Sequence, residues 1–417
     1  MENAINPKPR LQIAVIVVLM IASVSIGGIV GYVFSATNLS SSIDELSLQL
    51  SSYKNQLEEL QNSKSITSIS NNVINDNSES DRHDDQALSF SELYEKVYNS
   101  VVVVEGFTVS SNMFGRAVYS SVQGSGFVYN YSGQIVVLTN NHVVDGVVNI
   151  TITFANGNAY SAEVLGADGY ADLAVLSVDA PDCEYCPLEI ISSSTLNVGD
   201  TLVAVGGPYG LAGTMTSGIV SALNRTITED MSGSYPIADV IQTSTPINSG
   251  NSGGPLFNAN GEVVGITTAI VSNSDGLGFA IPSDTILREI EVLITQGSYN
   301  DHPVIGAYGV DMNYQIAQAM ETNITYGWLI THITSKGPAD DATLKGGDTN
   351  IIVGSTTTTI GGDIIVAING SRIRNIDDLS TYLERNTLPE ETVTVTIIRN
   401  NQMLDLSLTL CSRPALS

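Results

Sequence analysis

The sequence predicts a mostly β protein with two folded domains behind an apolar N-terminal segment. Its 417 residues exceed one average domain of about 150 residues. Brief β-branched runs, separated by Gly, Asn and Asp, recur between residues 101 and 270 without helical patterns between them, as is typical of an antiparallel sandwich or barrel. After residue 303 the pattern changes to short strands, a Gly/Thr-rich insertion at 345–359 and a helix beginning near Asp377, which predicts a second domain.

Residues 11–34 are almost wholly apolar and follow two basic residues, Lys8 and Arg10. A run of this length can cross a bilayer as a helix, and the basic residues favour a cytoplasmic segment at 1–10. A cleaved signal peptide is the alternative, but its apolar core is usually about 7 to 15 residues long. Phe34 also stands where cleavage after Ala36 would need a small residue. We therefore expect a single-pass membrane protein whose remaining residues are extracytoplasmic.

The stretch that follows, residues 35–60, carries apolar side chains at spacings of three and four: Ile43, Leu46, Leu50, Tyr53, Leu57 and Leu60. This spacing predicts a short coiled-coil stalk that would help identical chains associate. An amphipathic helix lying on the membrane explains the same pattern. Residues 61–88 are polar and lack any period, which predicts a flexible linker.

Composition excludes several classes of protein. The chain has 16 Lys+Arg against 43 Asp+Glu and a formal net charge of -27, so it would repel the phosphate backbone of a nucleic acid. Three cysteines lack the further Cys or His pair of a zinc site, and we expect neither a metal nor a cofactor. Cys183 and Cys186 could form a small disulfide loop outside the cytoplasm. Redox catalysis by this pair would require a thioredoxin-like fold, which the pattern does not predict.

Ser252 is the first candidate for chemistry. It lies in the segment GNSGGP at residues 250–255, where flanking glycines let the backbone approach a substrate carbonyl. The amides of Gly250 and Ser252 could then face a developing oxyanion. A Gly-rich serine turn by itself is more often only a turn.

A serine nucleophile needs a base, and elimination selects His142. The other three histidines lie outside the β-rich region: His83, His302 and His332. A carboxylate must then orient the imidazole. Asp172 enters an apolar strand, where burial without a partner would be costly. Asp145 and Asp168 are the alternatives, each beside a glycine in a predicted turn.

Four collinear segments make a family resemblance specific: TNNHVV at 139–144, DLAV at 172–175, GNSGGPL at 250–256 and GLGFAIP at 276–282. In this order they resemble the HtrA/Deg family of trypsin-like serine proteases, and the similarity covers about residues 90–412. An α/β-hydrolase is the alternative, because GNSGG also fits G-x-S-x-G. That fold requires alternating strands and helices and the order Ser, Asp, His, neither of which is found.

The resemblance implies a chymotrypsin-like double β-barrel at 89–297 and a C-terminal PDZ domain at 302–412. It implies that His142 is the general base, that Asp172 orients it, and that the amides of Gly250 and Ser252 form the oxyanion hole. Unfolded or damaged extracytoplasmic proteins would be the substrates, and the protease domains would form a trimer. A non-catalytic or dual-function surface chaperone that only holds peptides is the alternative function.

The residues beside the serine predict an apolar specificity pocket. Six positions before Ser252 stands Pro246, followed by Ile247, so no carboxylate is available for a basic substrate side chain. The next strand should supply the opposite wall, with Thr267, Thr268 and Ala269. We expect cleavage after small or medium aliphatic residues.

In the C-terminal domain, the segment VIGA at 304–307 resembles the carboxylate-binding loop of HtrA PDZ domains. By that resemblance the backbone at Ile305, Gly306 and Ala307 binds the C-termini of peptides, and the peptide adds a strand to the sheet edge. Leu379 and Leu383 lie four residues apart on the predicted helix, where they could line this groove or pack in the core.

Overall fold

The computed structural model describes residues 88–111, 115–207, 213–227, 236–248, 250–268 and 277–414. The chain divides into two units, residues 1–83 and 84–417, and every described residue belongs to the second. The predicted anchor at 11–34 and the predicted stalk at 35–60 lie outside the described residues. Within the described ranges, no helix has the length and apolar character needed to cross a membrane.

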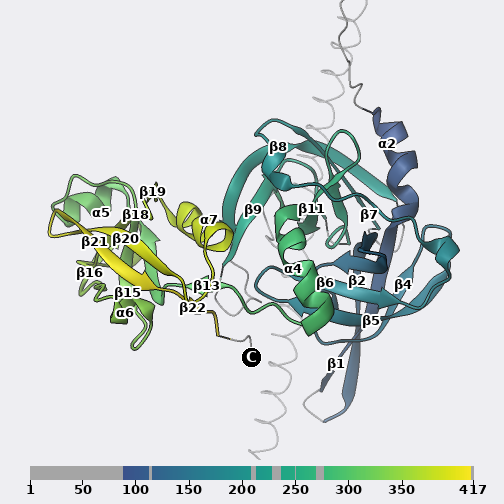
Figure 1. The fold of residues 1–417 in the computed structure, drawn as a ribbon, viewed down its shortest axis with the longest axis horizontal. Helices are drawn as coiled ribbons and strands as arrows, with labels where there is room; N and C mark the ends of the chain where they lie inside the picture. Colours follow the sequence, from purple (N-terminus) through teal and green to yellow (C-terminus); the bar gives the residue numbers. More distant parts are fainter. Residues whose placement is uncertain are drawn as a thin grey trace, which may run out of the picture. The chain divides into compact units, whose positions relative to one another are not determined.

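Six antiparallel strands form the first closed barrel, in the order β1-β2-β3-β6-β5-β4 (Figure 1). Their bounds are β1 Val101–Ser111, β2 Ala117–Tyr131, β3 Gln134–Thr139, β4 Val147–Thr153, β5 Ala159–Asp168 and β6 Leu173–Val178. The four valines that begin β1 are all buried because both faces of the strand are covered. Val102 and Val104 pack in one apolar cluster, whereas Val101 packs in another. A continuous apolar run is therefore explained by burial on two sides.

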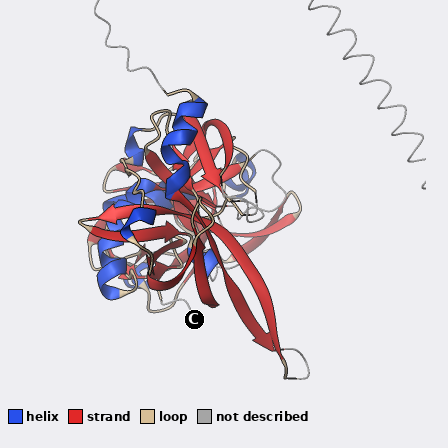
Figure 2. Ribbon diagram, turned by 90° about the vertical axis from the view of Figure 1, so that its right-hand side faces the viewer, coloured by secondary structure: helices blue, strands red, loops and turns tan. Residues whose placement is uncertain are grey.

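Strands β1 and β2 also form a long ribbon, which Figure 2 shows extending beyond the barrel. They pair without interruption from Val101 opposite Phe127 to Ser111 opposite Ala117. The outer part of the ribbon is exposed, so only its inner half contributes to the barrel core.

The second closed barrel has the order β10-β11-β12-β9-β8-β7. Its bounds are β7 Thr201–Gly206, β8 Thr214–Ile227, β9 Ile237–Thr243, β10 Pro255–Phe257, β11 Val263–Thr268 and β12 Gly278–Pro282. The predicted double β-barrel is confirmed, and each barrel has six strands. One apolar cluster joins residues of both barrels, including Leu138 and Leu173 of the first and Val203 and Ile266 of the second.

Among the described residues, the α-helices that accompany the barrels are α2 Phe90–Val97, α3 Asn141–Val144 and α4 Ser283–Gln296. Short 3-10 helices occur at η1 Tyr98–Ser100, η2 Asp182–Glu184 and η3 Ser193–Thr195. Helix α2 begins with a capping box in which Ser89 and Glu92 satisfy each other's backbone amides. Helix α4 follows Pro282, and Asp284 lies in its first turn. Gly297 ends α4 in the left-handed conformation, with φ of 82°.

The C-terminal domain contains a six-stranded sheet. Five of its strands follow one another in the order β14-β15-β18-β20-β21, and the short β19 pairs with β18. Its strands are β13 Pro303–Val304, β14 Ala307–Asp311, β15 Trp328–Ile333, β16 Thr349–Val353, β17 Thr356–Ile360, β18 Ile364–Ile368, β19 Ser371–Arg372, β20 Thr392–Arg399, β21 Gln402–Thr409 and β22 Cys411–Ser412. Its helices are α5 Tyr314–Ala319, α6 Pro338–Asp341 and α7 Ile376–Asn386. The Gly/Thr-rich insertion forms the hairpin β16–β17.

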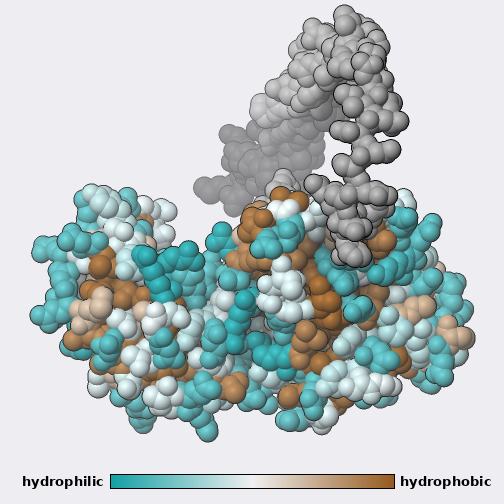
Figure 3. Space-filling view, turned by 45° about the horizontal axis from the view of Figure 1, so that its top comes forward, coloured by the Kyte–Doolittle hydropathy of each residue, from teal (hydrophilic) through white to brown (hydrophobic). Residues whose placement is uncertain are grey.

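Polar contacts join the C-terminal domain to the second barrel. Helix α7 lies against β8 and β9 (Figure 1). Asp377, in the first turn of α7, accepts from the Arg225 side chain at 2.9 Å and from the Thr226 amide at 2.8 Å. Farther along the helix, Arg385 donates to Asp239 at 2.6 Å. On the face shown in Figure 3, hydrophilic residues are interspersed with separate apolar groups.

Candidate active site

His142 and Asp172 form a hydrogen-bonded pair in which the acid is buried and the histidine is partly exposed. His142 lies in the short helix α3, directly after β3, and Asp172 lies in the turn that leads into β6. The ring Nδ1 is 3.0 Å and 2.9 Å from the two carboxylate oxygens. A carboxylate only accepts, so Nδ1 carries the proton and Nε2 is left to act as a base. The side chain of Asp172 is 3% exposed and that of His142 is 24% exposed, so the base can meet a substrate.

The backbone of Asp172 is held in an unusual conformation. Its φ is 54°, a left-handed value that costs a non-glycine residue about 1–3 kcal/mol. The Asn140 side chain donates to the Asp172 carbonyl at 2.9 Å, and the His142 amide donates to its carboxylate at 2.9 Å. Thr268 of β11 adds a hydroxyl at 3.2 Å from the carboxylate, which links this acid to the second barrel.

Ser252 lies in a turn that only glycines permit. Gly250 and Gly253 have φ of 99° and 85°. A Cβ on Gly253 would lie 2.1 Å from the Ser125 carbonyl oxygen, so a larger residue cannot fit there. Thr267 steadies the turn by donating to the Asn251 carbonyl at 2.6 Å, and the Gly253 amide donates to the Thr267 carbonyl at 2.9 Å.

Backbone contacts bring the serine turn to the histidine. The Ser125 amide of β2 donates to the Ser252 carbonyl at 2.8 Å. The neighbouring Gly124 lies against that same carbonyl oxygen and against Val143, the residue after His142. The structure thus gathers His142, Asp172 and the serine turn in one place, where strands of both barrels meet.

Ser125 is a residue of this site that the sequence reasoning missed. Its hydroxyl donates to the Gly250 carbonyl at 2.6 Å and accepts from the Gly207 amide at 2.8 Å. It therefore fixes the orientation of the loop before Ser252. A serine between two glycines within a β-strand carries no sequence signal for such a role.

A second site lies in the C-terminal domain. A groove of about 490 Å³ is lined by residues that include Ile305, Gly306, Ala307, Leu379, Leu383 and Arg413. The two leucines are also buried members of the domain core, so both interpretations of them hold. The carbonyls of Ile305 and Gly306 accept from the amides of Ala339 and Thr334 at 2.9 Å, which fixes the loop at the mouth of the groove.

Family models match both domains. Residues 124–266 match the trypsin-like peptidase domain and residues 305–410 match the PDZ domain. The chain is 35% identical over 336 residues to Protease Do-like 1, chloroplastic, of Arabidopsis thaliana, an alignment that covers 78% of this chain and 72% of that one. The chain belongs to the HtrA/Deg family of serine endoproteases.

Other relatives agree with this assignment. A probable periplasmic serine endoprotease DegP-like of Brucella suis is 37% identical over 295 residues, covering 70% of this chain; the chain spans only 53% of that relative's length. Among solved structures, the HtrA-type protease AlgW with tripeptide has a TM-score of 0.60 at 27% identity, covering 79% of this chain and 99% of that one. The serine endoprotease from Yersinia pestis has a TM-score of 0.51 at 28% identity, covering 78% and 99%.

The predicted specificity residues of this HtrA-family chain divide into three groups. Ile247 is half-buried and packs against Gly278 of β12. Thr267 and Thr268 are buried, and their hydroxyls support the serine turn and Asp172. Ala269 lies outside the described residues. The apolar pocket therefore stays a prediction.

The two cysteines of the CxxC segment carry free, exposed thiols in the structure. Cys183 lies within η2 and Cys186 follows its end. No disulfide joins them in this structure. The disulfide loop remains a prediction for oxidising conditions.

His302, which elimination set aside, and Asp168, an alternative orienting acid, form a second histidine–aspartate pair. His302 Nε2 lies 2.7 Å from the Asp168 carboxylate, and its Nδ1 lies 3.0 Å from Glu384. His302 follows the barrel strands in the sequence, but its side chain contacts Asp168 at the end of β5. A separation of 134 residues hides this pair from any local pattern.

Proposed function

We propose that this chain is a membrane-anchored serine endopeptidase that cleaves unfolded extracytoplasmic proteins with His142, Asp172 and Ser252. The hydrogen bonds between His142 Nδ1 and the buried Asp172 carboxylate carry the proposal, because they leave Nε2 as a base beside the serine turn. Family membership supports the same chemistry.

In this mechanism His142 Nε2 takes the proton of the Ser252 hydroxyl as the serine oxygen attacks the substrate carbonyl. The imidazolium that forms is stabilised by Asp172, which stays ionised. His142 then gives the proton to the leaving amine, and an acyl group remains on Ser252. In the second half of the reaction, His142 takes a proton from a water molecule as the water oxygen attacks the acyl carbonyl. The Ser252 oxygen then leaves with the proton from His142, and the carboxylic acid product is released.

The amides of Gly250 and Ser252 would bind the oxyanion of the tetrahedral intermediate. The loop before Ser252 is held through Ser125, so these donors are positioned before substrate arrives. Loss of one such donor typically costs about 2.7–4 kcal/mol of transition-state stabilisation. The substrate side chain would enter an apolar pocket near Ile247, and cleavage would follow Val, Ile, Ala or Leu.

The PDZ groove would bind the free C-termini of peptides and either recruit substrates or regulate the protease. Its size and its apolar walls support a ligand of a few residues. The structural relative AlgW was solved with a tripeptide and belongs to the same family. Binding without cleavage would correspond to the alternative function of a surface chaperone.

Residues 11–34 would anchor the protein in the membrane, with residues 1–10 in the cytoplasm and both folded domains outside it. The apolar run and the basic residues before it support this proposal. The stalk at 35–60 would help several chains associate, and the family resemblance suggests a trimer of protease domains.

The test uses casein as an unfolded substrate, with residues 84–417 and the Ser252→Ala variant compared side by side. We expect the wild-type chain to cleave casein after aliphatic residues, as read by sequencing the products, and the variant to retain binding but not cleavage. Equal cleavage by both proteins would contradict a serine mechanism. Products that end in Lys or Arg would contradict the apolar pocket alone.

A further inference from the structure

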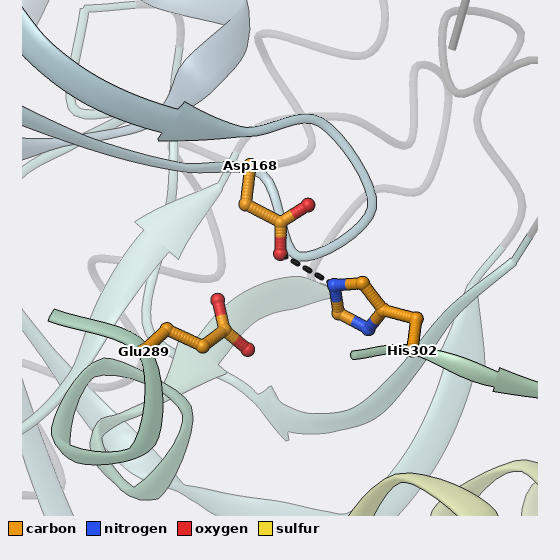
Figure 4. Close-up of side chains that lie close together, drawn as sticks. All are labelled: Asp168, Glu289 and His302. Atoms are coloured by element: carbon orange, nitrogen blue, oxygen red, sulfur yellow. Dashed lines mark hydrogen bonds and ion pairs between the residues drawn. The ribbon is translucent and has the colours of Figure 1, made fainter. Parts of the chain in front are cut away.

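A buried cluster of ionisable groups lies at the junction of the two domains. It joins Asp168 at the end of β5, Glu289 on α4 and His302 just before β13 (Figure 4). The side chains of His302 and Asp168 are 3% and 2% exposed, and Glu289 is fully buried. None of these residues takes part in the proposed reaction.

His302 bridges two carboxylates. Its Nε2 lies 2.7 Å from Asp168 Oδ2 and its Nδ1 lies 3.0 Å from Glu384 Oε2. Because carboxylates accept and do not donate, both ring nitrogens carry protons and the ring is an imidazolium. Burial opposes the charged form, but the hydrogen bonds and charges of Asp168 and Glu384 outweigh it and raise the pKa of His302 to about 9.

Further charged and titratable groups contact this cluster, and Arg288 also lies 3.8 Å from Glu384. From α4, Arg288 donates to Glu289 at 2.5 Å. From the C-terminal segment, Arg413 donates to the second oxygen of Glu384. The rings of Tyr170 and Tyr299 pack against the His302 ring at centroid distances of 5.4 and 4.9 Å.

The same atoms invite a comparison with a metal site. Ligand atoms of Asp168, Glu289 and His302 lie within 4.8 Å of one another. Two guanidinium groups and one imidazolium already face the three acidic side chains Asp168, Glu289 and Glu384. A divalent cation would have to displace the Nε2 proton that His302 shares with Asp168 and would enter next to these positive groups, so the arrangement favours ion pairs over a bound metal.

Asp168 connects this cluster to the catalytic acid. Its second oxygen, Oδ1, accepts from the Tyr170 amide at 2.8 Å and so folds the turn at residues 169–172. That turn ends at Asp172, whose left-handed backbone persists only if its surroundings hold it. By holding the Asp168 side chain, the hydrogen bond from His302 therefore helps to restrain the turn that ends at Asp172.

We propose that His302 is a positioning residue for Asp172 that acts through its hydrogen bond to Asp168. The inference rests on the proposed serine mechanism, since it concerns the acid of that site. Through Glu384 on α7, the same side chain ties this turn to the helix that carries groove residues Leu379 and Leu383.

Two amide substitutions separate the two arms of His302. In His302→Gln the side-chain nitrogen can take the place of Nε2 and still donate to Asp168, whereas in His302→Asn it can take only the place of Nδ1. Both variants are neutral, so they form a matched pair. Casein cleavage is measured as kcat and KM per folded molecule in the full chain, with Ser252→Ala as the background.

We expect His302→Asn to lower kcat about tenfold with little change in KM, because a small displacement of Asp172 costs rate rather than substrate binding. His302→Gln should stay within about threefold of wild type. In His302→Asn the acidic limb of the pH–rate profile should also move to lower pH, since a displaced Asp172 supports the imidazolium form of His142 less well. Asp168→Asn, which keeps an oxygen for the Tyr170 amide, should behave like His302→Asn and replaces it if that variant does not fold.

Equal kcat values in wild type and both His302 variants would overturn this inference alone. An equal loss in both His302 variants would also overturn it, because the charge and not the Asp168 arm would then matter. Inhibition by a chelator with recovery on Zn²⁺ addition would assign the cluster to a metal instead. Absence of any Ser252-dependent cleavage in the wild type would overturn the proposed function and this inference together.

Discussion

At the scale of single residues, the site depends on side chains that hold backbone and not only on those that react. Asp172 keeps a left-handed φ because Asn140 and His142 bond its carbonyl and its carboxylate. The Ser125 hydroxyl forms hydrogen bonds with the Gly250 carbonyl and the Gly207 amide, which belong to two loops beside the serine turn. Several hydrogen bonds from neighbouring residues therefore hold the reacting groups in position.

The Ser125→Ala substitution tests this view. It leaves the Gly250 carbonyl and the Gly207 amide without their buried partner, so we expect a loss of about 1–3 kcal/mol in unfolding free energy. Cleavage should fall as well, because the loop carrying Gly250 is less restrained. Urea unfolding and casein assays measure the two effects.

Ser121→Ala is the matched control, since Ser121 lies on the same strand but is exposed. It should change neither quantity by more than about 0.5 kcal/mol. A Ser125→Ala variant as stable and as active as this control would contradict the role given to Ser125.

At the scale of elements, sequence predicted those features that local chemistry dictates. The proximity of His142, Asp172 and the serine turn was predictable because each lies in a distinctive segment and only one histidine falls among the barrel strands. His302 escaped prediction because its partners come from β5 and α7, and contacts between distant elements leave no local pattern.

The PDZ groove gives a prediction at this scale. A peptide with a free C-terminal carboxylate and an apolar last residue should bind, and its C-terminal amide should bind about tenfold or more weakly, because charge-assisted hydrogen bonds to backbone amides are lost. Fluorescence anisotropy of one labelled peptide in both forms provides the comparison. Equal affinities would exclude recognition of the carboxylate.

At the scale of the whole described unit, ion pairs between the protease and PDZ domains connect their stability to pH. Burial, followed by the charge of Asp168, raises the pKa of Glu289 to about 8, and the partners of His302 raise its pKa to about 9. A raised pKa in the folded state means that the stabilisation is complete below the unfolded value and declines as pH rises through the folded value. For His302 this window extends from about 6.5 to about 9.

We therefore expect the thermal midpoint of residues 84–417 to fall between pH 7 and pH 10, by about 5 °C or more. His302→Gln should reduce this dependence, since the variant has no proton to lose at that position. His332→Gln is the control, because His332 does not belong to the cluster. A steep pH dependence that survives His302→Gln unchanged would assign it to other groups.

The central claim is that Ser252 is a nucleophile activated by His142, and covalent labelling with a fluorophosphonate tests it most directly. Intact-mass and peptide analysis should find one phosphonyl group per chain, on Ser252, with labelling at least about a hundredfold slower in His142→Ala. Labelling of wild type and His142→Ala at the same rate, or modification at a residue other than Ser252, would contradict the account.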